Sequence, residues 1–253
     1  MNSYTSTELM VYAAARVIEN KRSYFVGTGL PMIAAMFAQR THAPDILVIF
    51  EAGGIGPRIP ALPISAGDGR TFYQAVAASS MLDTMSIAQA GYADYSFLGA
   101  AQIDGYGNIN TTVIGPYDRP KVRLPGSGGA NDLGSFCRRT IVIMRQDKKK
   151  FVEKLDFLTT PGYLNGPGAR EAAGLPEDTG PYRVVTQLGV YGFDSASKKM
   201  TVLSLHPGVT LQDAQNNSSF GILIPEKGIG VTPSPAQEEI ELLRSLDPAR
   251  ISI

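Results

Sequence analysis

Apolar runs and polar connections alternate along the first fifty residues in the order helix, strand, helix, strand. A Thr-x-x-Glu capping box at Thr5 begins a helix, since apolar residues follow it at helical spacing. Residues 24–26 form a short apolar run that ends in the glycine loop 27–29, and Pro31 stands where a second helix begins. Residues 46–50 are continuously apolar, which is typical of a strand buried on both faces of a parallel sheet.

The middle of the chain repeats this pattern more loosely. Helical spacing runs from Thr71 to about Gln89 and predicts one helix there. Short apolar runs after it predict three strands, over residues 96–98, 109–114 and 141–144. The sequence therefore continues as alternating helices and strands to about residue 144.

The last third of the chain does not continue the alternation of helices and strands. Residues 146–150 are a charged run expected to face solvent, and residues 161–181 are rich in Gly and Pro, which predicts a long irregular loop. Strands are expected over 183–190 and 200–205, joined as an antiparallel hairpin at the edge of the sheet. A final helix follows Pro235, with apolar residues on one face.

This order of elements predicts an α/β fold, with an open, mostly parallel sheet flanked by helices and an antiparallel edge hairpin near the C-terminus. Residues 24–50 make a βαβ unit, for which a right-handed crossover is the rule. No fixed-period repeat and no low-complexity segment interrupts the chain, so a single domain over residues 1–253 is expected.

Composition and charge reduce the number of function classes that fit the sequence. The 253 residues are 43% hydrophobic and 18% charged, which is globular composition. Lysine plus arginine (23) equals aspartate plus glutamate (23), so there is no net basic charge to indicate binding to nucleic acid or to an anionic membrane. The N-terminus does not resemble a signal peptide, and no apolar run approaches the ~18 residues that a membrane span requires.

The metal-binding and redox residues are few. One cysteine, Cys137, allows no internal disulfide and fits a cytoplasmic protein. With only His42 and His206, a histidine-rich metal site is not expected, and His206 before Pro207-Gly208 is interpreted as a turn residue. No metal and no bound cofactor is predicted.

Glu51 is the residue most indicative of catalysis. It follows the apolar run 46–50 and precedes Ala52, Gly53 and Gly54. Ligands of open α/β sheets bind outside the carboxyl ends of the strands, and two glycines would leave room there for a substrate. A partly desolvated carboxylate is a good nucleophile. The structural alternative is that Glu51 caps a loop or pairs with Arg58.

A glycine loop runs from Pro125 to Asp132. Gly126, Gly128 and Gly129 allow backbone N–H groups to converge on one point, where they can hold an oxyanion or a phosphate. The loop lacks the lysine of a P-loop and the spacing of a dinucleotide-binding loop. A plain tight loop would also account for it.

Polar residues and glycines alternate from Gly99 to Asn110. Gln102 and Asn108 are candidates to orient a bound acyl group, and Asp104 is a candidate to brace the loop. The alternative is an Asp-Gly/Gly-Asn turn between two strands.

Together these motifs resemble the β subunit of the family I coenzyme A (CoA) transferases, with the glutaconate CoA-transferase branch the most similar. The resemblance rests on Glu51-Ala-Gly-Gly, on the run from Gly99 to Asn110, and on the glycine loop from Gly126 to Asp132. It extends over most of the chain and is weakest across residues 146–181. Many family members have Ser-Glu-Asn-Gly where this chain has Phe50 to Gly53, and a double glycine where it has Pro125-Gly126; these departures bear on the substrate.

The resemblance implies roles for individual residues. Glu51 would be the covalent nucleophile, and amides at Gly128, Gly129 and Ala130 would form the oxyanion hole. Contacts to substrate or CoA are expected from Gly27, Gly29, Gly53, Gly54, Gln102, Asn108, Gly126 and Ser127. The resemblance also implies an α subunit of similar fold that completes the site in a larger oligomer, with acyl-CoA and a free carboxylic acid as substrates.

Two other functions fit the same fold. Relatives act as acyl-CoA hydrolases or decarboxylases, and the architecture also resembles sugar-phosphate isomerases, which suggests a non-catalytic binder of a phosphate or sugar phosphate. The acyl group cannot be read from the sequence. Arg58 and Tyr73 are candidates to contact a second carboxylate on it.

Overall fold

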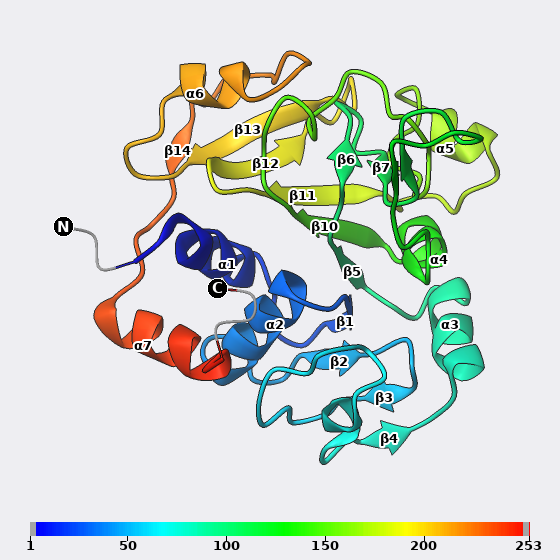
Figure 1. Ribbon diagram of the computed structural model, residues 1–253, viewed down its shortest axis with the longest axis vertical. Helices are drawn as coiled ribbons and strands as arrows, with labels where there is room; N and C mark the ends of the chain where they lie inside the picture. The colour runs from blue at the N-terminus through cyan, green and yellow to red at the C-terminus, as the bar shows by residue number, and fades with distance from the viewer. Residues whose placement is uncertain (1–3, 250–252) are drawn as a thin grey trace.

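The computed structural model describes residues 4–249 and 253, and within them ten strands form one sheet (Figure 1). In spatial order these strands are β14 (Gly230–Val231), β13 (Met200–Leu205), β12 (Gly189–Phe193), β11 (Pro181–Val185), β10 (Arg139–Ile143), β5 (Tyr95–Leu98), β1 (Ser23–Val26), β2 (Leu47–Ile49), β3 (Gly54–Ile55) and β4 (Ala77–Ala78). Two small antiparallel pairs lie outside it: β6 (Gln102–Ile103) with β7 (Ile109–Asn110), and β8 (Val113–Ile114) with β9 (Val122–Arg123).

The helices are α1 (Ser6–Arg16), α2 (Leu30–Arg40), α3 (Met81–Gln89), α4 (Ala130–Phe136), α5 (Ala169–Ala172), α6 (Leu211–Asn216) and α7 (Gln237–Leu246), with one 3-10 turn, η1 (Gly69–Phe72). The capping box predicted at Thr5 begins α1, and Pro31 lies in the first turn of α2. Helix α7 buries Ile240, Leu243 and Leu246 on one face, as the sequence predicts.

The centre of the sheet is parallel. Strands β2, β1, β5, β10 and β11 pair in parallel, whereas β3 and β4 at one end and β12 and β13 at the other pair antiparallel. This confirms the predicted α/β class with an open, mostly parallel sheet flanked by helices.

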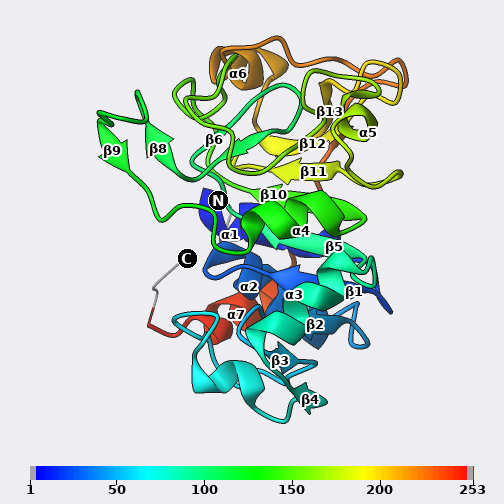
Figure 2. The ribbon, with the colours of Figure 1, turned by 90° about the vertical axis from the view of Figure 1, so that its right-hand side faces the viewer.

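The side chains of each central strand alternate between two helical layers. Tyr24 and Val26 face the core shared with α1, α2 and α7, whereas Phe25 faces the core shared with α3 and α4. Figures 1 and 2 show these two helix groups on opposite faces of the sheet. Burial on both faces explains the apolar runs of β1 and of the second half of β10. The predicted burial of residues 46–50 fails at Leu47, which is 37% exposed at the start of β2.

The prediction of one helix over residues 71–89 is wrong for its first half. Only α3 is α-helical, and the residues before it form the 3-10 turn η1 and the edge strand β4, which pairs with β3. Ser80 is the N-cap of α3, and its side chain accepts from the backbone N–H of Asp83 in a capping box. The capping residue thus fixes a helix start that apolar spacing alone places too early.

The strand predicted over residues 109–114 is interrupted. The Asn110 side chain accepts from the backbone N–H groups of Thr112 and Val113, and this turn separates β7 from β8. The prediction that residues 146–150 face solvent is wrong for Gln146. This side chain is buried and hydrogen-bonded to Thr186 and Tyr191.

The C-terminal hairpin exists but is shifted. Residues 183–190 span a turn at Thr186 and belong to two strands, β11 and β12. Strands β12 and β13 form the predicted antiparallel hairpin, and β14 pairs in parallel outside β13, so the hairpin is next to the edge of the sheet and not the edge itself. Among the described residues, no helix has the length and apolar character needed to span a bilayer.

Candidate active site

Glu51 stands directly beyond the carboxyl end of β2, and its side chain is half-buried. Its backbone carbonyl accepts a hydrogen bond from the Thr84 hydroxyl of α3 at 2.8 Å. Next to it, the backbone N–H of Gly53 donates to the carbonyl of Phe50 and closes a tight turn. The carboxylate is therefore carried by a backbone that is fixed from two directions.

Gly53 and Gly54 do not leave room for a substrate, contrary to the sequence expectation. A Cβ on Gly53 would overlap the carbonyl oxygen of Ser79, and a Cβ on Gly54 would overlap that of Thr71. Gly53 also has a φ of +119°, which side-chain-bearing residues rarely adopt. These glycines let the chain around η1 and β4 pack against the turn that carries Glu51.

The glycine loop lies beside Glu51. The backbone N–H of Gly129 donates to Oε2 of Glu51 at 3.3 Å, although 78 residues separate the two. Gly129 is the N-cap of α4, so this amide is at the helix end that favours a negative charge. A Cβ on Gly129 would lie 2.7 Å from the same carboxylate oxygen, so only glycine fits the contact.

The amides of the loop are not equivalent. Gly126 and Gly128 have φ values of +95° and +49°, which turn the loop sharply. The N–H of Ala130 already donates to the carbonyl of Ser127 at 2.9 Å, so it is not free to bind an oxyanion as expected. The N–H of Gly128 has no acceptor among the described residues. Gly128 and Gly129 are therefore the candidate oxyanion donors.

A threonine that sequence reasoning missed holds this loop. Thr111 accepts a hydrogen bond from the N–H of Gly126 at 2.9 Å through its carbonyl, and its hydroxyl donates back to the Gly126 carbonyl at 2.8 Å. Thr84 was missed in the same way. Both are ordinary threonines in sequence, and only their long-range partners reveal their role.

A pocket of about 310 Å³ opens beside Glu51. Gly27 and Thr28 after β1, Leu98 at the end of β5, and the loop from Pro125 to Ala130 line it. A second pocket of about 430 Å³ shares these walls and continues over Ala100, Ala101 and Leu124. Glu51 is the single charged residue that lines either pocket among the described residues.

Gln102 and Asn108 lie away from both pockets, in contrast to their predicted contact with the acyl group. Gln102 donates to Asp156 and accepts from Asn110, whereas Asn108 donates to Asp104 and Leu164. Both side chains are buried, and their partners account for their polarity. They stabilise the turns around β6 and β7, and Asp104 braces this loop by accepting from the backbone of Tyr106 and Asn108.

Of the other residues predicted to contact substrate or CoA, some line the pocket beside Glu51 and some do not. Gly27, Gly126 and Ser127 line the pocket, whereas Gly29 caps α2 with a φ of +77° and does not. Arg58 and Tyr73 do not line it either, and no ion pair between Arg58 and Glu51 occurs among the described residues.

Cys137 and His206 are both buried. Burial raises the pKa of Cys137 to about 12, which leaves its thiol protonated at neutral pH. Burial also lowers the pKa of His206, whose Nε2–H donates to the carbonyl of Thr186 at 2.8 Å. The described residues contain no group of three His, Cys, Asp or Glu side chains able to hold a metal ion.

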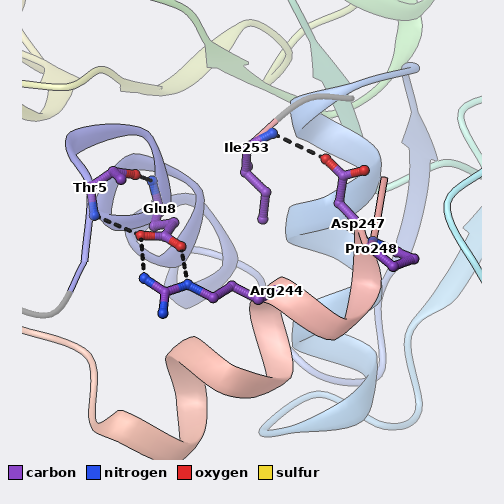
Figure 3. Close-up of a pocket in the computed structure, with 6 residues that line it drawn as sticks. All are labelled: Thr5, Glu8, Arg244, Asp247, Pro248 and Ile253. Carbon is purple, nitrogen blue, oxygen red and sulfur yellow. Dashed lines mark hydrogen bonds and ion pairs between the residues drawn. The ribbon is translucent and has the colours of Figure 1, made fainter. Parts of the chain in front are cut away.

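A further pocket, of about 380 Å³, lies between α1 and α7 (Figure 3). Its charged side chains already bind one another: Arg244 Nε donates to Glu8 Oε1 at 2.6 Å, and a second guanidinium nitrogen reaches Oε2 at 3.2 Å. Burial alone would raise the pKa of Glu8, but hydrogen bonds from Arg244 and Thr5 outweigh it and lower that pKa. We interpret this pocket as part of the helix packing.

Comparison with known proteins gives consistent matches. The coenzyme A transferase family model matches residues 7–217. The chain is 41% identical to the B subunit of the 3-oxoadipate CoA-transferase of Pseudomonas knackmussii, over 98% of this chain and 95% of the relative. It is 36% identical to the B subunit of the glutaconate CoA-transferase of Acidaminococcus fermentans, over 99% and 96%. The crystal structure of glutaconate coenzyme A-transferase from that organism superposes with a TM-score of 0.94 at 35% identity, covering 100% of this chain and 98% of that one.

Proposed function

This chain belongs to the coenzyme A transferase family, and we propose that it is the Glu51-bearing subunit of a heteromeric CoA-transferase that moves CoA between carboxylic acids. The observation that supports this most directly is the Glu51 carboxylate held by the Gly129 amide at the wall of an otherwise uncharged pocket. Its relatives are named as B subunits, which supports an α subunit as partner.

The reaction proceeds by covalent catalysis in two halves. One oxygen of Glu51 attacks the acyl-CoA carbonyl carbon; the C–S bond breaks, leaving a mixed anhydride and CoA thiolate. The thiolate then attacks the Glu51 carbonyl carbon, and the donor acid leaves with that glutamate oxygen. The resulting Glu51–CoA thioester is attacked by the acceptor carboxylate, and the same steps run in reverse. No proton is transferred at any step, so no histidine is required.

We infer different roles for the two Glu51 oxygens, and the 3.3 Å contact between Gly129 N and Oε2 supports this. Oε2, held by Gly129, remains as the carbonyl oxygen of the anhydride and the thioester, while Oε1 attacks. When thiolate adds to this carbonyl, the negative charge develops on the oxygen that already faces the Gly129 N–H. The N–H of Gly128, which has no acceptor within residues 4–249, is the second donor in this proposal. Each such donor is typically worth ~10²–10³ in rate.

The substrates that we propose are short dicarboxylic acids and their CoA thioesters, because the two relatives named above act on 3-oxoadipate and glutaconate. Such an acid carries a second carboxylate, which requires a cation or several donors. No cation of the described residues lines either pocket beside Glu51. We therefore assign recognition of the second carboxylate to the α subunit.

The test is an intact-mass measurement on the chain co-expressed with its α subunit. Incubation with 3-oxoadipyl-CoA or glutaconyl-CoA, without acceptor acid, should add one CoA to this chain. Peptide mapping should find the adduct at Glu51, and an added carboxylate should remove it. Glu51→Gln should form no adduct and lose at least about 10³-fold in transferase activity.

Two outcomes would contradict the proposal. Steady release of free CoA or carbon dioxide with no adduct would instead indicate a hydrolase or a decarboxylase. Full activity in Glu51→Gln would remove the nucleophile assignment altogether.

A further inference from the structure

The hairpin that ends in the glycine loop projects from the body of the molecule. We call residues 111–126 the arm; it contains β8, β9 and a turn at 116–119 (Figure 2). Thr111 and Leu124 at its base form part of the wall of the larger pocket, which shares Gly27, Thr28, Leu98 and part of the glycine loop with the pocket beside Glu51. The groove from Glu51 therefore leads to the base of the arm.

Backbone pairing runs continuously from the base of the arm toward its tip. Gly126 pairs with Thr111, Leu124 with Thr112, and Lys121 with Ile114. The register between them is Val113 opposite Arg123 and Ile114 opposite Val122. The glycine loop is thus the direct continuation of a hydrogen-bonded ladder.

Two contacts fix the arm against residues 156–157 of the same protein chain. The ring of Tyr117 stacks on that of Phe157, with centroids 5.4 Å apart and planes at 24°. The N–H of Gly115 donates to the carboxylate of Asp156 at 3.1 Å. A projecting hairpin held in this way presents its side chains in a defined position.

The arm carries positive charge that nothing in the described chain neutralises. Arg119, Lys121 and Arg123 are exposed, and none of them forms an ion pair among the described residues. Asp118 is the arm's single carboxylate. Lys121 directly precedes β9, and Arg123 is the second residue of that strand. The Arg123 guanidinium lies over the Tyr117 ring, 5.2 Å from its centroid.

We propose that Lys121 and Arg123 bind the phosphate groups of coenzyme A; this rests on the proposed function. The thiol of CoA must reach Glu51, while its phosphates are at the far end of an extended, uncharged pantetheine chain. An uncharged groove leading from Glu51 to a cationic arm matches this order of groups. Fully extended, the chain from Gly126 to Lys121 spans at most roughly 17 Å, at ~3.4 Å per residue, so the proposed phosphate site lies within that distance of the glycine loop beside Glu51.

The test compares two thioesters of the same acyl group on the purified complex with the α subunit, one of CoA and one of pantetheine, which has no phosphate. In K121Q/R123Q, kcat/KM for acyl-CoA should fall about tenfold, because two charge-assisted contacts are lost. The value for acyl-pantetheine should stay within about twofold of the parent enzyme, because this thioester makes neither contact. Raising the salt concentration should reduce the difference between parent and variant for acyl-CoA.

The matched control is K199Q/K227Q, which removes the same charge from two exposed lysines that line neither pocket. It should leave both thioesters unaffected. Equal loss with the two thioesters, loss of the α subunit from purified K121Q/R123Q, or no change at all would each overturn the proposal. The Glu51 adduct, formed from either thioester, reports on the proposed function separately.

Discussion

At the scale of single residues, the fit between Gly129 and Glu51 defines the candidate site. A methyl group at position 129 would lie 2.7 Å from Oε2 of Glu51 and 3.3 Å from the Met85 side chain. We therefore expect Gly129→Ala to push the carboxylate away from the amide. Since that amide stabilises the oxyanion in the proposed mechanism, kcat should fall about 10²-fold. Steady-state kinetics of the complex with its α subunit measures this.

The control for this substitution is Gly221→Ala, at a glycine with open space where the Cβ would go and no positive φ. It should retain parent activity. Both variants should keep the parent Tm, because neither residue is part of a hydrophobic core cluster. A Gly129→Ala enzyme with parental kcat would show that the amide does not act on the reacting carbonyl.

At the scale of elements, the Gly129 amide lies at the start of helix α4, and a buried arginine of α5 contacts the other end of α4. Arg170 is 2% exposed. Its guanidinium donates to the carbonyls of Gly134 and Ser135 near the end of α4, and to those of Pro161 and Gly162. A cation at a helix C-terminus is favoured by the helix dipole. Arg170 therefore fixes α4, and through it the glycine loop.

Replacing Arg170 by methionine should leave these carbonyls without donors in a buried place. We expect a loss of about 2–4 kcal/mol in the free energy of unfolding, and a fall in kcat that exceeds the change in KM. Urea unfolding and steady-state kinetics measure the two effects. Arg16→Met, at an exposed arginine of α1, is the control and should change neither. Unchanged stability in Arg170→Met would refute the bracing role.

Sequence patterns predict the elements whose signals are local. The capping box at Thr5, the proline of α2 and the continuous apolar strands come from neighbouring residues, and they agree with the structure. The extended chain at β4 depends on pairing with β3, which helical spacing does not reveal. The side chains of Gln102 and Asn108 form hydrogen bonds within buried turns. The polarity of a residue in the sequence does not distinguish this structural role from a contact to substrate.

At the scale of the whole molecule, the ion pair between Glu8 and Arg244 joins helices 236 residues apart in sequence (Figure 3). The pKa of Glu8 is lowered from its ordinary value of 4.5, so this pair stabilises the fold above about pH 4.5 and loses that effect as pH falls below it. We expect Glu8→Gln to lower Tm at pH 7 and to converge with the parent protein at lower pH. Thermal unfolding over a pH series measures this, and a Tm difference that does not depend on pH would contradict it.

The exposed apolar side chains suggest where the α subunit covers the site. Val76 and Leu82 are 79% and 77% exposed, and Ile64, Tyr73 and Met81 are exposed beside them in sequence. These residues belong to the segment that packs on Gly53 and Gly54 and leads into Thr84, which holds the Glu51 backbone. Exposed apolar side chains on the segment that contacts the Glu51 turn are what a closing partner would bury to keep water from the anhydride.

We therefore expect Leu82→Glu to reduce recovery of the co-expressed α subunit about tenfold, because a charge buried in an apolar interface is strongly unfavourable. Val231→Glu is the control: Val231 is 72% exposed, but it lies on β14, at the opposite edge of the sheet from β4. Affinity purification through a tag on the α subunit measures recovery, and unfolding curves verify that both variants fold. Normal recovery with Leu82→Glu and loss with Val231→Glu would instead place the partner at the β14 edge, away from Glu51.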